Sequence, residues 1–430
     1  MSAPEQRFTP VLLTLPGLTP TLALEILPHG VTLHRLFVQA DGRTHDLLIG
    51  PENPADHLTQ KYTNTIVGRY ANRLPVNQDA FPLSRNGHSS TFTPQSNESP
   101  TVSLHGGRVG FDYVEWTPLL DPSESQLFTD AEKSHLNGSD GVVGVIFKRI
   151  SEDGEEGYPG RLLVETLVSL VEPSGPQAES VKTGSELKLG SVVIVYRAKL
   201  LDEGKVTPIN LTQHWGFNLD ASLKESLTVK EHTLSIKADH TIELNNVGLS
   251  TGSLLPVTGT HHAHAEKESK KIGEKWPTSG YDEFYVFSPR STPTLPTRVP
   301  VSEFTPTSDL LKEIITSEAS SKDPLVQLAS EKSGLRVSFD SNQSGVQFYS
   351  NNLTNEKNGA RKKIHGGSGV SGAGDSYGVG SAAFLEFHEP LAAWLNPSTI
   401  GHSGNDTLLA SGEIYNNFVK MDVWFKSPVA

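Results

Sequence analysis

Seven polar side chains lie in short polar signatures that are spaced through a β-rich sequence. They are Asn72 and Arg73 in GRYANR, His105 in SLHGG, His214 in NLTQHWGFNL, Asp282 in GYDEF, Gln347 in GVQFYS and Glu386 in FLEFHEP. An imidazole titrates near neutrality, and a carboxylate after an apolar run has its charged form disfavoured, which moves its pKa toward the working range. Amides and a guanidinium fork are suited to hydroxyl oxygens. These residue types could transfer protons and bind hydroxyl groups.

The amino-acid composition excludes several other kinds of site. The chain of 430 residues contains no Cys, which removes disulfides, thiolate metal sites and a Cys nucleophile. It carries 36 Lys and Arg against 49 Asp and Glu, a formal charge of −13 at pH 7. This charge repels nucleic acids and anionic membranes, so we expect neither as a partner and a small neutral or cationic molecule as the ligand.

Two motifs with a familiar functional interpretation lack the context that they need. Residues 367–372 spell GxGxxG, but no strand precedes them and no helix follows, so we interpret them as a flexible loop. His261, His262 and His264 are too close together to face one ion without a special turn, and we predict a solvated loop rather than a metal site. No nucleophile motif of the G-x-S-x-G kind occurs in a suitable context.

Alternation of apolar and polar residues dominates over helical periodicity, and Gly, Pro, Asn and Asp separate the alternating segments. Strands are predicted at residues 31–42, 142–151, 161–170, 191–201, 227–238, 335–341 and 419–427. One segment, from Asp309 to residue 331, has convincing helical spacing. The chain is therefore predicted to be all-β, with antiparallel sheets packed about 10 Å apart.

The order of the polar segments resembles the aldose 1-epimerase family, also called galactose mutarotases. The resemblance extends from about residue 24 to the final strand, which ends at residue 425. It implies a single domain over residues 1–430, folded as that family's large twisted antiparallel β-sandwich, a supersandwich, with few short helices. Four segments match nothing familiar and are interpreted as insertions, near residues 123–139, 260–275, 291–332 and 351–382. The Gly/Ser-rich part of the last one is expected to be mobile.

The resemblance also implies a role for each of the seven residues. His214 corresponds to the general acid that acts on the sugar ring oxygen, and Glu386 corresponds to the general base. The remaining five correspond to residues that bind the sugar: Asn72, Arg73, His105, Asp282 and Gln347. Trp215, Phe284 and Phe348 either stack on the sugar or pack in the core.

These roles imply an isomerase that interconverts the α and β anomers of free aldohexoses such as galactose or glucose. The C1 hydroxyl loses a proton while the ring oxygen gains one, the ring opens, C1 turns, and the ring closes on the opposite face. One acid and one base are sufficient, so neither a metal nor an organic cofactor is expected. The expected substrate is a monosaccharide; the preferred hexose and the oligomeric state are not indicated.

The segment around Glu386 departs from the family pattern. A small or polar residue and an amide usually follow this Glu, whereas Phe387 and His388 follow here. Strand alternation places Glu386 and His388 on one face and Glu389 on the other, so Glu389 is predicted to be peripheral. Arg69, in the same segment as Asn72, is predicted to be structural.

Three other functions stay open. A phosphosugar epimerase, such as a hexose-6-phosphate 1-epimerase, would need a basic pocket, and residues 361–363 are the one obvious basic cluster. A glycosidase would need two carboxylates about 5–10 Å apart across a cleft, which Asp282 and Glu386 could supply. A noncatalytic carbohydrate-binding protein could keep the cleft without turnover.

The first 30 residues lack a basic start followed by an uninterrupted apolar core, so we predict no signal peptide. No stretch approaches the roughly 18 apolar residues of a membrane helix. The cytoplasm is the expected location.

Overall fold

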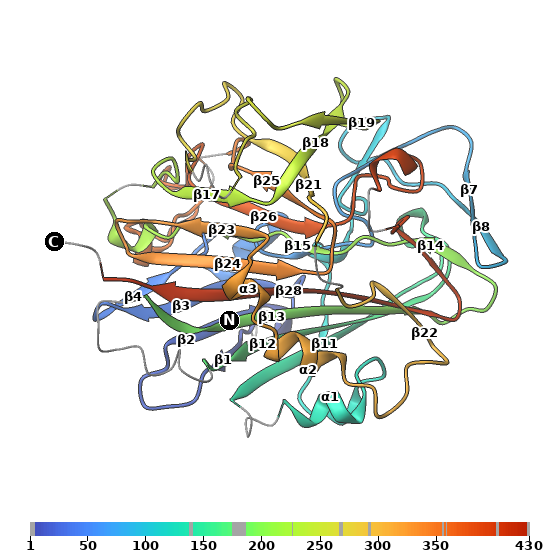
Figure 1. Ribbon diagram of the computed structural model, residues 1–430, viewed down its shortest axis with the longest axis horizontal. Helices are drawn as coiled ribbons and strands as arrows, with labels where there is room; N and C mark the ends of the chain where they lie inside the picture. Colours follow the sequence, from blue (N-terminus) through green and yellow to red (C-terminus); the bar gives the residue numbers. More distant parts are fainter. Residues whose placement is uncertain are drawn as a thin grey trace.

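The structure, a computed structural model, describes residues 5–136, 141–173, 186–225, 227–265, 270–290, 294–354, 357, 359–400 and 404–427. Strands make up most of its regular structure, and the named strands pair with one another only in antiparallel fashion (Figure 1). Three short α-helices are described, α1 (Asp130–Ser134), α2 (Leu310–Thr316) and α3 (Ala319–Lys322). The prediction of an all-β antiparallel sandwich with few short helices is confirmed.

The largest sheet contains the strands that were most evident in the sequence. Its order is β10 (Thr117–Leu119), β11 (Val142–Ser151), β12 (Leu162–Val171), β13 (Leu187–Leu200), β28 (Glu413–Phe425), β24 (Leu335–Ser341), β23 (Val326–Ala329), β17 (Thr233–Ile236) and β20 (Lys270–Lys271), and β22 (Arg298–Pro300) also pairs with β28. The C-terminal strand β28 thus lies in the middle of the sheet, between β13 and β24.

Two smaller sheets and four strand pairs complete the sandwich. One sheet has the order β16 (Gly216–Phe217), β26 (Ala383–His388), β25 (Gly345–Tyr349), β21 (Asp282–Phe287), β18 (Ala238–Leu244) and β19 (Ser250–Pro256). The other runs from β1 (Val11–Thr14) through β2 (Leu22–Leu27) and β3 (Thr32–Ala40) to β4 (Arg43–Asp46). The pairs are β5 (Ile66–Val67) with β15 (Thr212–Gln213), β6 (Arg73–Pro75) with β9 (Val102–Leu104), β7 (Phe81–Arg85) with β8 (His88–Phe92), and β14 (Val206–Pro208) with β27 (Leu408–Ala410).

The main core lies between the inner faces of these sheets. Trp215, Phe339 and Phe387 pack together in it, beside apolar residues of β2, β3, β12, β13 and β28. Every residue of β12 is buried, which means that this strand is covered on both faces. For this reason the strand predicted at residues 161–170 has apolar residues on both faces rather than on alternate positions only.

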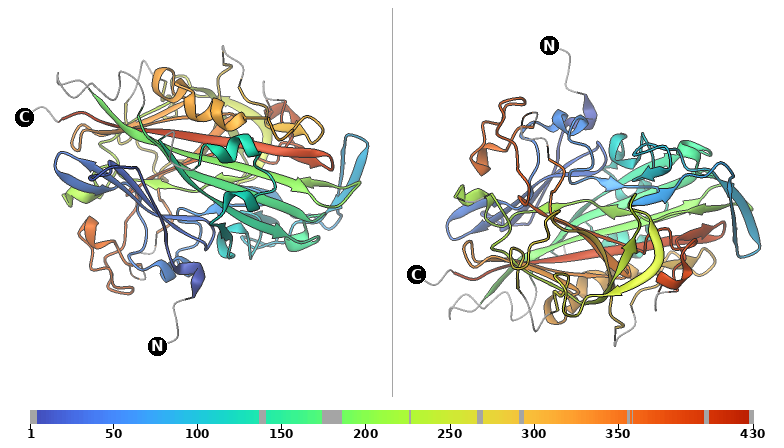
Figure 2. Two further views of the ribbon diagram at one scale, coloured as in Figure 1. Left: turned by 90° about the horizontal axis from the view of Figure 1, so that it is seen from below. Right: turned by 90° about the horizontal axis from the view of Figure 1, so that it is seen from above.

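The outer face of the large sheet is covered by α1, α2 and the chain next to them (Figure 2). Leu311 and Ile314 of α2 pack against apolar residues of β11 to β13. Arg197 of β13 forms a fully buried ion pair with Glu132 of α1, at 2.5 Å. Parts of the segments near 123–139 and 291–332 therefore close a second apolar core. Whether these segments are insertions into one domain stays a prediction.

The helix predicted from Asp309 is confirmed only in its first half. Asp309 caps α2 by accepting a hydrogen bond from the backbone N–H of Lys312. The prediction is wrong beyond Lys322, because Pro324 interrupts the helical hydrogen bonds and residues 326–329 form β23 instead. Leu and Val in this stretch alternate as a strand within the large sheet.

The segment at residues 351–382 is more ordered than its Gly/Ser content suggests. Lys362 and His365 are buried within it, and the Lys362 ammonium contacts the Asp46 carboxylate at 2.8 Å. The same ammonium donates to the backbone oxygens of His34 and Leu48, at 2.6 and 2.8 Å. The expectation that the Gly/Ser-rich run from His365 onward stays out of the compact core is wrong for His365, which is buried. The charge pair of Lys362, just before that run, fastens the segment to β3 and β4.

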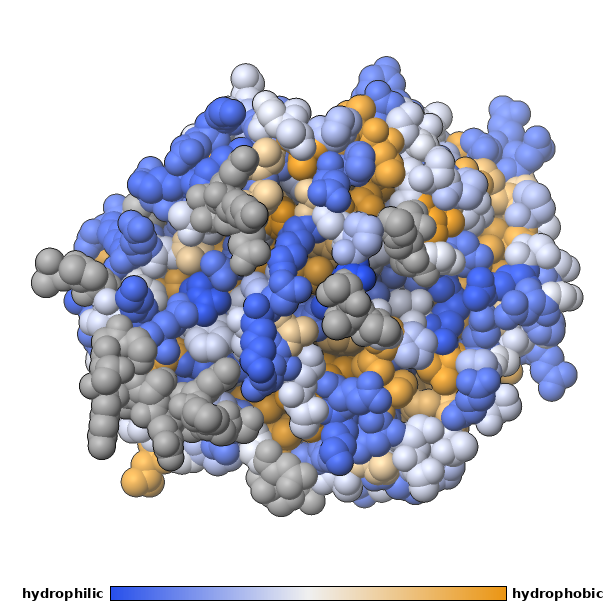
Figure 3. All heavy atoms as spheres, viewed as in Figure 1, coloured by the Kyte–Doolittle hydropathy of each residue, from blue (hydrophilic) through white to orange (hydrophobic). Residues whose placement is uncertain are grey.

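The His-rich segment at residues 260–265 is also partly inside the protein. His264 is buried against the rings of Tyr281, Tyr285 and Phe348. The prediction of a solvated loop is wrong for this residue. None of the described helices is long and apolar enough to cross a bilayer. The face shown in Figure 3 is largely hydrophilic, with apolar side chains in scattered patches.

Candidate active site

Three of the predicted site residues lie side by side on one face of the smaller sheet. Glu386 of β26 is opposite Gln347 of β25, and Gln347 is opposite Phe284 of β21. Asp282 precedes Phe284 by two residues and therefore points to the same face. The strand order β26, β25, β21 thus sets the carboxylate opposite the amide, with the second carboxylate diagonally beyond the amide on the same face.

His214 lies on the far side of Glu386 from Gln347. It lies between β15 and β16, and β16 pairs with β26 through Gly216 and Phe384. The backbone of His214 is fixed in both directions, because its N–H donates to Thr65 O and its oxygen accepts from Asn64 N–H, both at 2.8 Å. The imidazole is held at the edge of the sheet beside the Glu386 carboxylate.

Asn72 and His105 enter the site from β6 and β9, which pair with each other. Both have left-handed backbone conformations, with φ of 65° and 53°. The two backbones are locked together: Asn72 N–H donates to His105 Nδ1 at 3.1 Å, and His105 N–H donates to Asn72 O at 3.0 Å. Because Nδ1 accepts, the proton of the neutral His105 ring lies on Nε2, which can donate to a ligand.

The glycine after His105 is required by close packing. Gly106 has φ of +88°, and a Cβ there would lie 2.0 Å from the backbone oxygen of Gly68. Any side chain would push β9 away from the Gly68 segment and would displace His105.

Side-chain amides connect the two parts of the site. Asn72 Nδ2 donates to Gln347 Oε1 at 3.1 Å, and Gln347 Nε2 donates to Asp282 Oδ1 at 2.8 Å. Arg73 N–H donates to Asn72 Oδ1 at 3.0 Å. This chain of hydrogen bonds fixes the orientation of each amide and leaves the second oxygen of Asp282 available.

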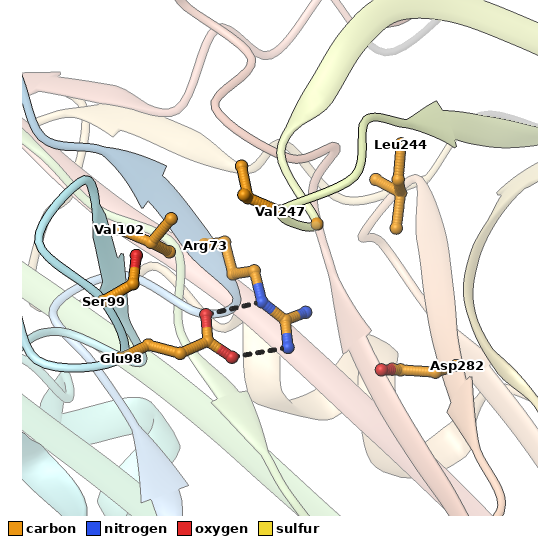
Figure 4. Close-up of a pocket in the computed structure, with 8 residues that line it drawn as sticks. Arg73, Glu98, Ser99, Val102, Leu244, Val247 and Asp282 are labelled. Atoms are coloured by element: carbon orange, nitrogen blue, oxygen red, sulfur yellow. Dashed lines mark hydrogen bonds and ion pairs between the residues drawn. The ribbon is translucent and has the colours of Figure 1, made fainter. Parts of the chain in front are cut away.

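Arg73 and Asp282 face each other across an open pocket of about 360 Å³ (Figure 4). The Arg73 guanidinium is held by two hydrogen bonds to the Glu98 carboxylate, both 2.8 Å long. Leu244 and Val247 supply apolar surface on the same pocket. Glu98 was not identified from the sequence. The feature that could have indicated it is its position between the segments that contain Arg73 and His105.

The decisive contact is between His214 Nε2 and Glu386 Oε1, which are 3.2 Å apart. Their side chains are only 11% and 3% exposed. Three aromatic rings surround the imidazole: Tyr62 at 6.4 Å, His105 at 5.5 Å and Phe384 at 4.8 Å between ring centroids. All seven residues predicted for the site are therefore gathered around one end of the smaller sheet.

Burial sets the charge of the acid–base pair. It raises the pKa of Glu386 well above its usual value, an effect that Asp282 reinforces and Arg73 opposes. Burial also lowers the pKa of His214 to about 4. The pKa of His105 is lowered well below its usual value by burial and by the neighbouring His214 and Arg73. Burial thus favours the neutral form of both Glu386 and His214.

The same groups could in principle share a metal ion. One ligand atom each from His105, His214 and Glu386 lies within 4.8 Å of the others. Two imidazoles and one carboxylate suit several divalent metals. His214 and Glu386 are also in direct contact at 3.2 Å, close enough to pass a proton between them.

With this geometry, the comparison with known proteins is direct. A family model described as aldose 1-epimerase matches residues 19–421. The chain belongs to the aldose 1-epimerase family. Galactose mutarotases from Bos taurus and Homo sapiens are 32% and 31% identical to it over 241 residues, which are 56% of this chain and 56% of each relative. The aldose 1-epimerase of Escherichia coli K12 is 27% identical over 222 residues, 51% of this chain and 50% of that protein. The chain thus spans about half the length of these curated relatives.

Solved structures share the fold along almost the whole chain. A GalM/aldose epimerase homologue from C. elegans has a TM-score of 0.64 at 20% sequence identity, covering 96% of this chain and 98% of that one. Galactose 1-epimerase from Lactobacillus acidophilus has a TM-score of 0.61 at 16% identity, with the same coverage. The resemblance to the aldose 1-epimerases seen in the sequence is confirmed, and so is their fold.

The aromatic residues beside the site differ from those considered in the sequence. Trp215 and Phe348 are buried in the main core, on the side away from Glu386. Phe284 lies on the face of Gln347 and packs on His388 at 4.7 Å between centroids. The ring that contacts His214 belongs instead to Phe384. Alternation could have indicated it, since Phe384 precedes Glu386 by two residues on the same strand face.

The two residues predicted to be outside the site behave differently. Arg69 is structural as predicted, with its buried guanidinium donating to backbone oxygens of Ser151, Pro159 and Gly160. Glu389 takes no part in the contact between His214 and Glu386; it is fully buried and accepts a hydrogen bond from the Ser344 hydroxyl. Burial raises its pKa to about 7. It directly follows β26 and its carboxyl is directed into the protein, a burial that strand alternation alone does not predict.

Proposed function

We propose that this protein is an aldose 1-epimerase that interconverts the α and β anomers of free aldohexoses such as galactose or glucose. The observation that carries the proposal is the contact between His214 and Glu386 at 3.2 Å. The hydroxyl oxygen and the ring oxygen of a hemiacetal are bonded to the same carbon. A base for one and an acid for the other must therefore be immediate neighbours, as these two groups are.

The reaction needs one proton to leave and one to arrive. In ring opening, the Glu386 carboxylate accepts the proton of the C1 hydroxyl while His214 Nε2–H gives its proton to the ring oxygen. The bond between C1 and the ring oxygen breaks, leaving an aldehyde and a C5 hydroxyl. After rotation about the C1–C2 bond, the two groups exchange roles, the ring closes on the other face, and the protonation state of the site is restored.

The pKa values of Glu386 and His214 bear on how the site reaches the protonation state that ring opening requires. The buried pair holds one proton, and moving it from Glu386 to His214 across their contact produces the carboxylate and imidazolium that opening requires. Because the proton moves within the pair, no exchange with solvent is needed before the chemical step. Each positioned group can contribute on the order of 10²–10⁴ in rate.

The other polar groups are placed to hold the sugar. Asp282 lies diagonally beyond Gln347 on the face that carries Glu386, and Arg73 faces it across the pocket (Figure 4). If C1 is at Glu386 and the ring oxygen at His214, the hydroxyls of C2 and C3 extend toward Gln347 and Asp282. Carboxylate and guanidinium groups held by Gln347 and Glu98 suit such vicinal hydroxyls.

One residue of the basic cluster considered for a phosphosugar epimerase is inaccessible. Lys362, the middle of the basic cluster at residues 361–363, is buried and paired with Asp46. A phosphate could not reach it without breaking that pair. In the pocket of Figure 4, Arg73 is already paired with Glu98.

The assignment of the base is tested by Glu386→Gln, which keeps the size of the side chain but removes the carboxylate. We expect its rate of anomer equilibration for freshly dissolved α-galactose or α-glucose, followed by polarimetry, to fall by about 10²–10⁴. Glu389→Gln is the matched control, because it changes a buried carboxyl three residues away that does not contact His214. That variant should keep most of the activity.

Three outcomes would contradict the proposal. A wild-type rate for Glu386→Gln would remove Glu386 as the base. Binding of galactose by the wild-type protein in calorimetry, without any acceleration of anomer exchange, would show a carbohydrate-binding protein. Release of reducing sugar from an aryl glycoside would instead favour a glycosidase that uses Asp282 and Glu386.

A further inference from the structure

The pocket of Figure 4 contains an arginine whose charge is already matched. Among the described residues that line it, Arg73 is the only cation, and Glu98 and Asp282 are the two anions. The Glu98 carboxylate accepts from Nε and Nη2 of Arg73, both at 2.8 Å. Asp282 lies on the other side of the guanidinium (Figure 4). With both carboxyl groups ionised, two negative charges face one positive charge, so the pocket repels an anion.

The turn that carries Glu98 is fastened to the strand before the binding histidine. Asn97 Oδ1 accepts a hydrogen bond from the backbone N–H of Leu104, the last residue of β9, at 2.6 Å. Asn97 Nδ2 donates to the backbone oxygen of Gly107 at 2.7 Å. The side chain of Glu98 is only 31% exposed and that of Arg73 only 16%. The carboxylate is therefore a fixed part of the pocket wall.

The turn between β18 and β19 encloses the other flank of Arg73. Gly248 in this turn has φ of +77°, and a Cβ there would lie 2.8 Å from Cδ and 2.9 Å from Nε of Arg73. Glycine thus allows the turn to close on the arginine side chain. The Arg73 guanidinium is held between this turn and Glu98.

The ion pair leaves Arg73 able to donate to a hydroxyl group. A guanidinium has five N–H groups, and in the part of the chain that the structure describes, Nη1 of Arg73 makes no hydrogen bond. A sugar hydroxyl can accept from this group and donate to the free oxygen of Asp282. An oxyanion can only accept, and it would meet two carboxylates beside a cation whose charge Glu98 already balances.

The connectivity of the sugar indicates which hydroxyl meets these groups. With O1 at Glu386, the hydroxyls of C2 and C3 extend toward Gln347 and Asp282, and C3 is the ring carbon farthest from the ring oxygen. Arg73 faces Asp282, so the O3 hydroxyl is the one between them. We propose that Glu98 determines specificity at this position: by matching the charge of Arg73, it restricts the site to aldohexoses without an anionic group on O3. This inference rests on the proposed function and narrows its substrate class.

The test compares two glucose derivatives that carry a substituent on the same oxygen. 3-O-Methylglucose is neutral, and glucose 3-sulfate carries a negative charge. Anomer exchange of each can be measured at equilibrium by two-dimensional exchange NMR, which needs no pure anomer. For the wild type we expect kcat/KM for the methyl ether to exceed that for the sulfate by about tenfold or more, the effect of one unit of charge roughly 10 Å away in a partly screened medium.

Two variants of Glu98 separate its charge from its packing. Glu98→Gln keeps the size of the side chain and removes the charge, so the ratio of sulfate to methyl ether kcat/KM should rise by about tenfold. Glu98→Asp keeps the charge and should keep the wild-type ratio, even where the rates for both sugars fall. A loss of packing alone would slow both sugars and leave the ratio unchanged.

Glu243→Gln is the matched control for net charge. Glu243 precedes the pocket-lining Leu244 on β18, where it accepts from the Thr251 hydroxyl at 2.6 Å rather than from Arg73. This variant removes the same unit of charge and should leave the ratio of the two sugars unchanged. A rise equal to that of Glu98→Gln would show an effect of net charge and would overturn the role of Glu98.

The remaining outcomes separate this inference from the proposed function. Acceleration of glucose exchange together with equal kcat/KM for the two derivatives, or with a ratio that Glu98→Gln does not change, would overturn Glu98 as the discriminating residue and leave the epimerase intact. Acceleration for glucose but for neither derivative in any variant would overturn the placement of O3. No acceleration for any sugar would refute the epimerase, and calorimetry would then decide: tighter binding of glucose 3-sulfate by Glu98→Gln than by the wild type supports the role of Glu98, and unchanged binding overturns it.

Discussion

At the scale of single residues, the site depends on one proton held between two buried groups. Glu386 and His214 are each shifted toward the neutral form, in opposite directions on the pH scale, because the protein withholds water from both. A partly exposed pair would hold two opposite charges and would attract a counter-ion or water instead of a hemiacetal. Burial thus allows the carboxyl group of Glu386 and the imidazole of His214 to exchange a proton with each other.

The pH profile of kcat/KM is predicted to be bell-shaped. Below the His214 pKa of about 4, both groups are protonated and the base is lost. Above the raised pKa of Glu386, both are deprotonated and the acid is lost. Activity should therefore persist between these two limits and decline on either side, with both limbs belonging to the pair rather than to one residue. Exchange NMR with subtraction of the uncatalysed rate would measure it; activity with a single limb near the ordinary pKa of imidazole would contradict it.

The seven proposed site residues could be selected from the sequence because their motifs, taken together, resemble one family. Gly106 is needed where the chain touches Gly68, and Asn72 adopts a left-handed conformation that Asn tolerates. Glu98, Tyr62 and Phe384 could not be selected. Their place depends on which strands meet in space, and no local pattern distinguishes a ring that faces the cleft from one that faces the core.

At the scale of elements, strand order brings distant residues together. His214 and Glu386 are neighbours only because β16 pairs with β26. The strands that carry the core were predictable, since β12 and β13 are long apolar runs. The environment of Lys362 was not, because a Gly-rich sequence gives no periodicity, and a single buried ion pair decides where the segment lies.

We predict that Lys362→Met destabilises the protein by about 3–5 kcal/mol, because it leaves the buried Asp46 carboxylate without its cation. Lys363→Met changes the exposed neighbour and should have little effect. Urea unfolding would give both free energies. A double variant, Lys362→Met with Asp46→Asn, should recover part of the loss, and equal stability of Lys362→Met and the wild type would show that the pair does not anchor the segment.

At the scale of the whole molecule, buried histidines connect folding to pH. Among the described residues, twelve imidazoles have a pKa below its ordinary value, chiefly because burial disfavours their charged form. Seven carboxyl groups have a raised pKa and act in the opposite sense. The imidazoles outnumber them, so the net effect between about pH 4 and 6.5 follows the histidines.

Stability is therefore predicted to fall on acidification within this range. The unfolded chain, whose imidazoles titrate near 6.5, binds more protons than the folded protein there, so the free energy of unfolding increases with pH. Thermal unfolding in buffers from pH 5 to 7 should give the lowest Tm at pH 5. A Tm that rises toward pH 5 would mean that the carboxyl groups dominate.

The central position of β28 has a consequence for synthesis. Because residues 413–425 form the strand between β13 and β24, a ribosome must pass residue 425 before the large sheet can close. Until then β13 and β24 each expose a row of unpaired amide and carbonyl groups that can pair with another nascent chain. Crowding on polysomes should therefore favour aggregation, and a chaperone that shields strand edges should increase the yield.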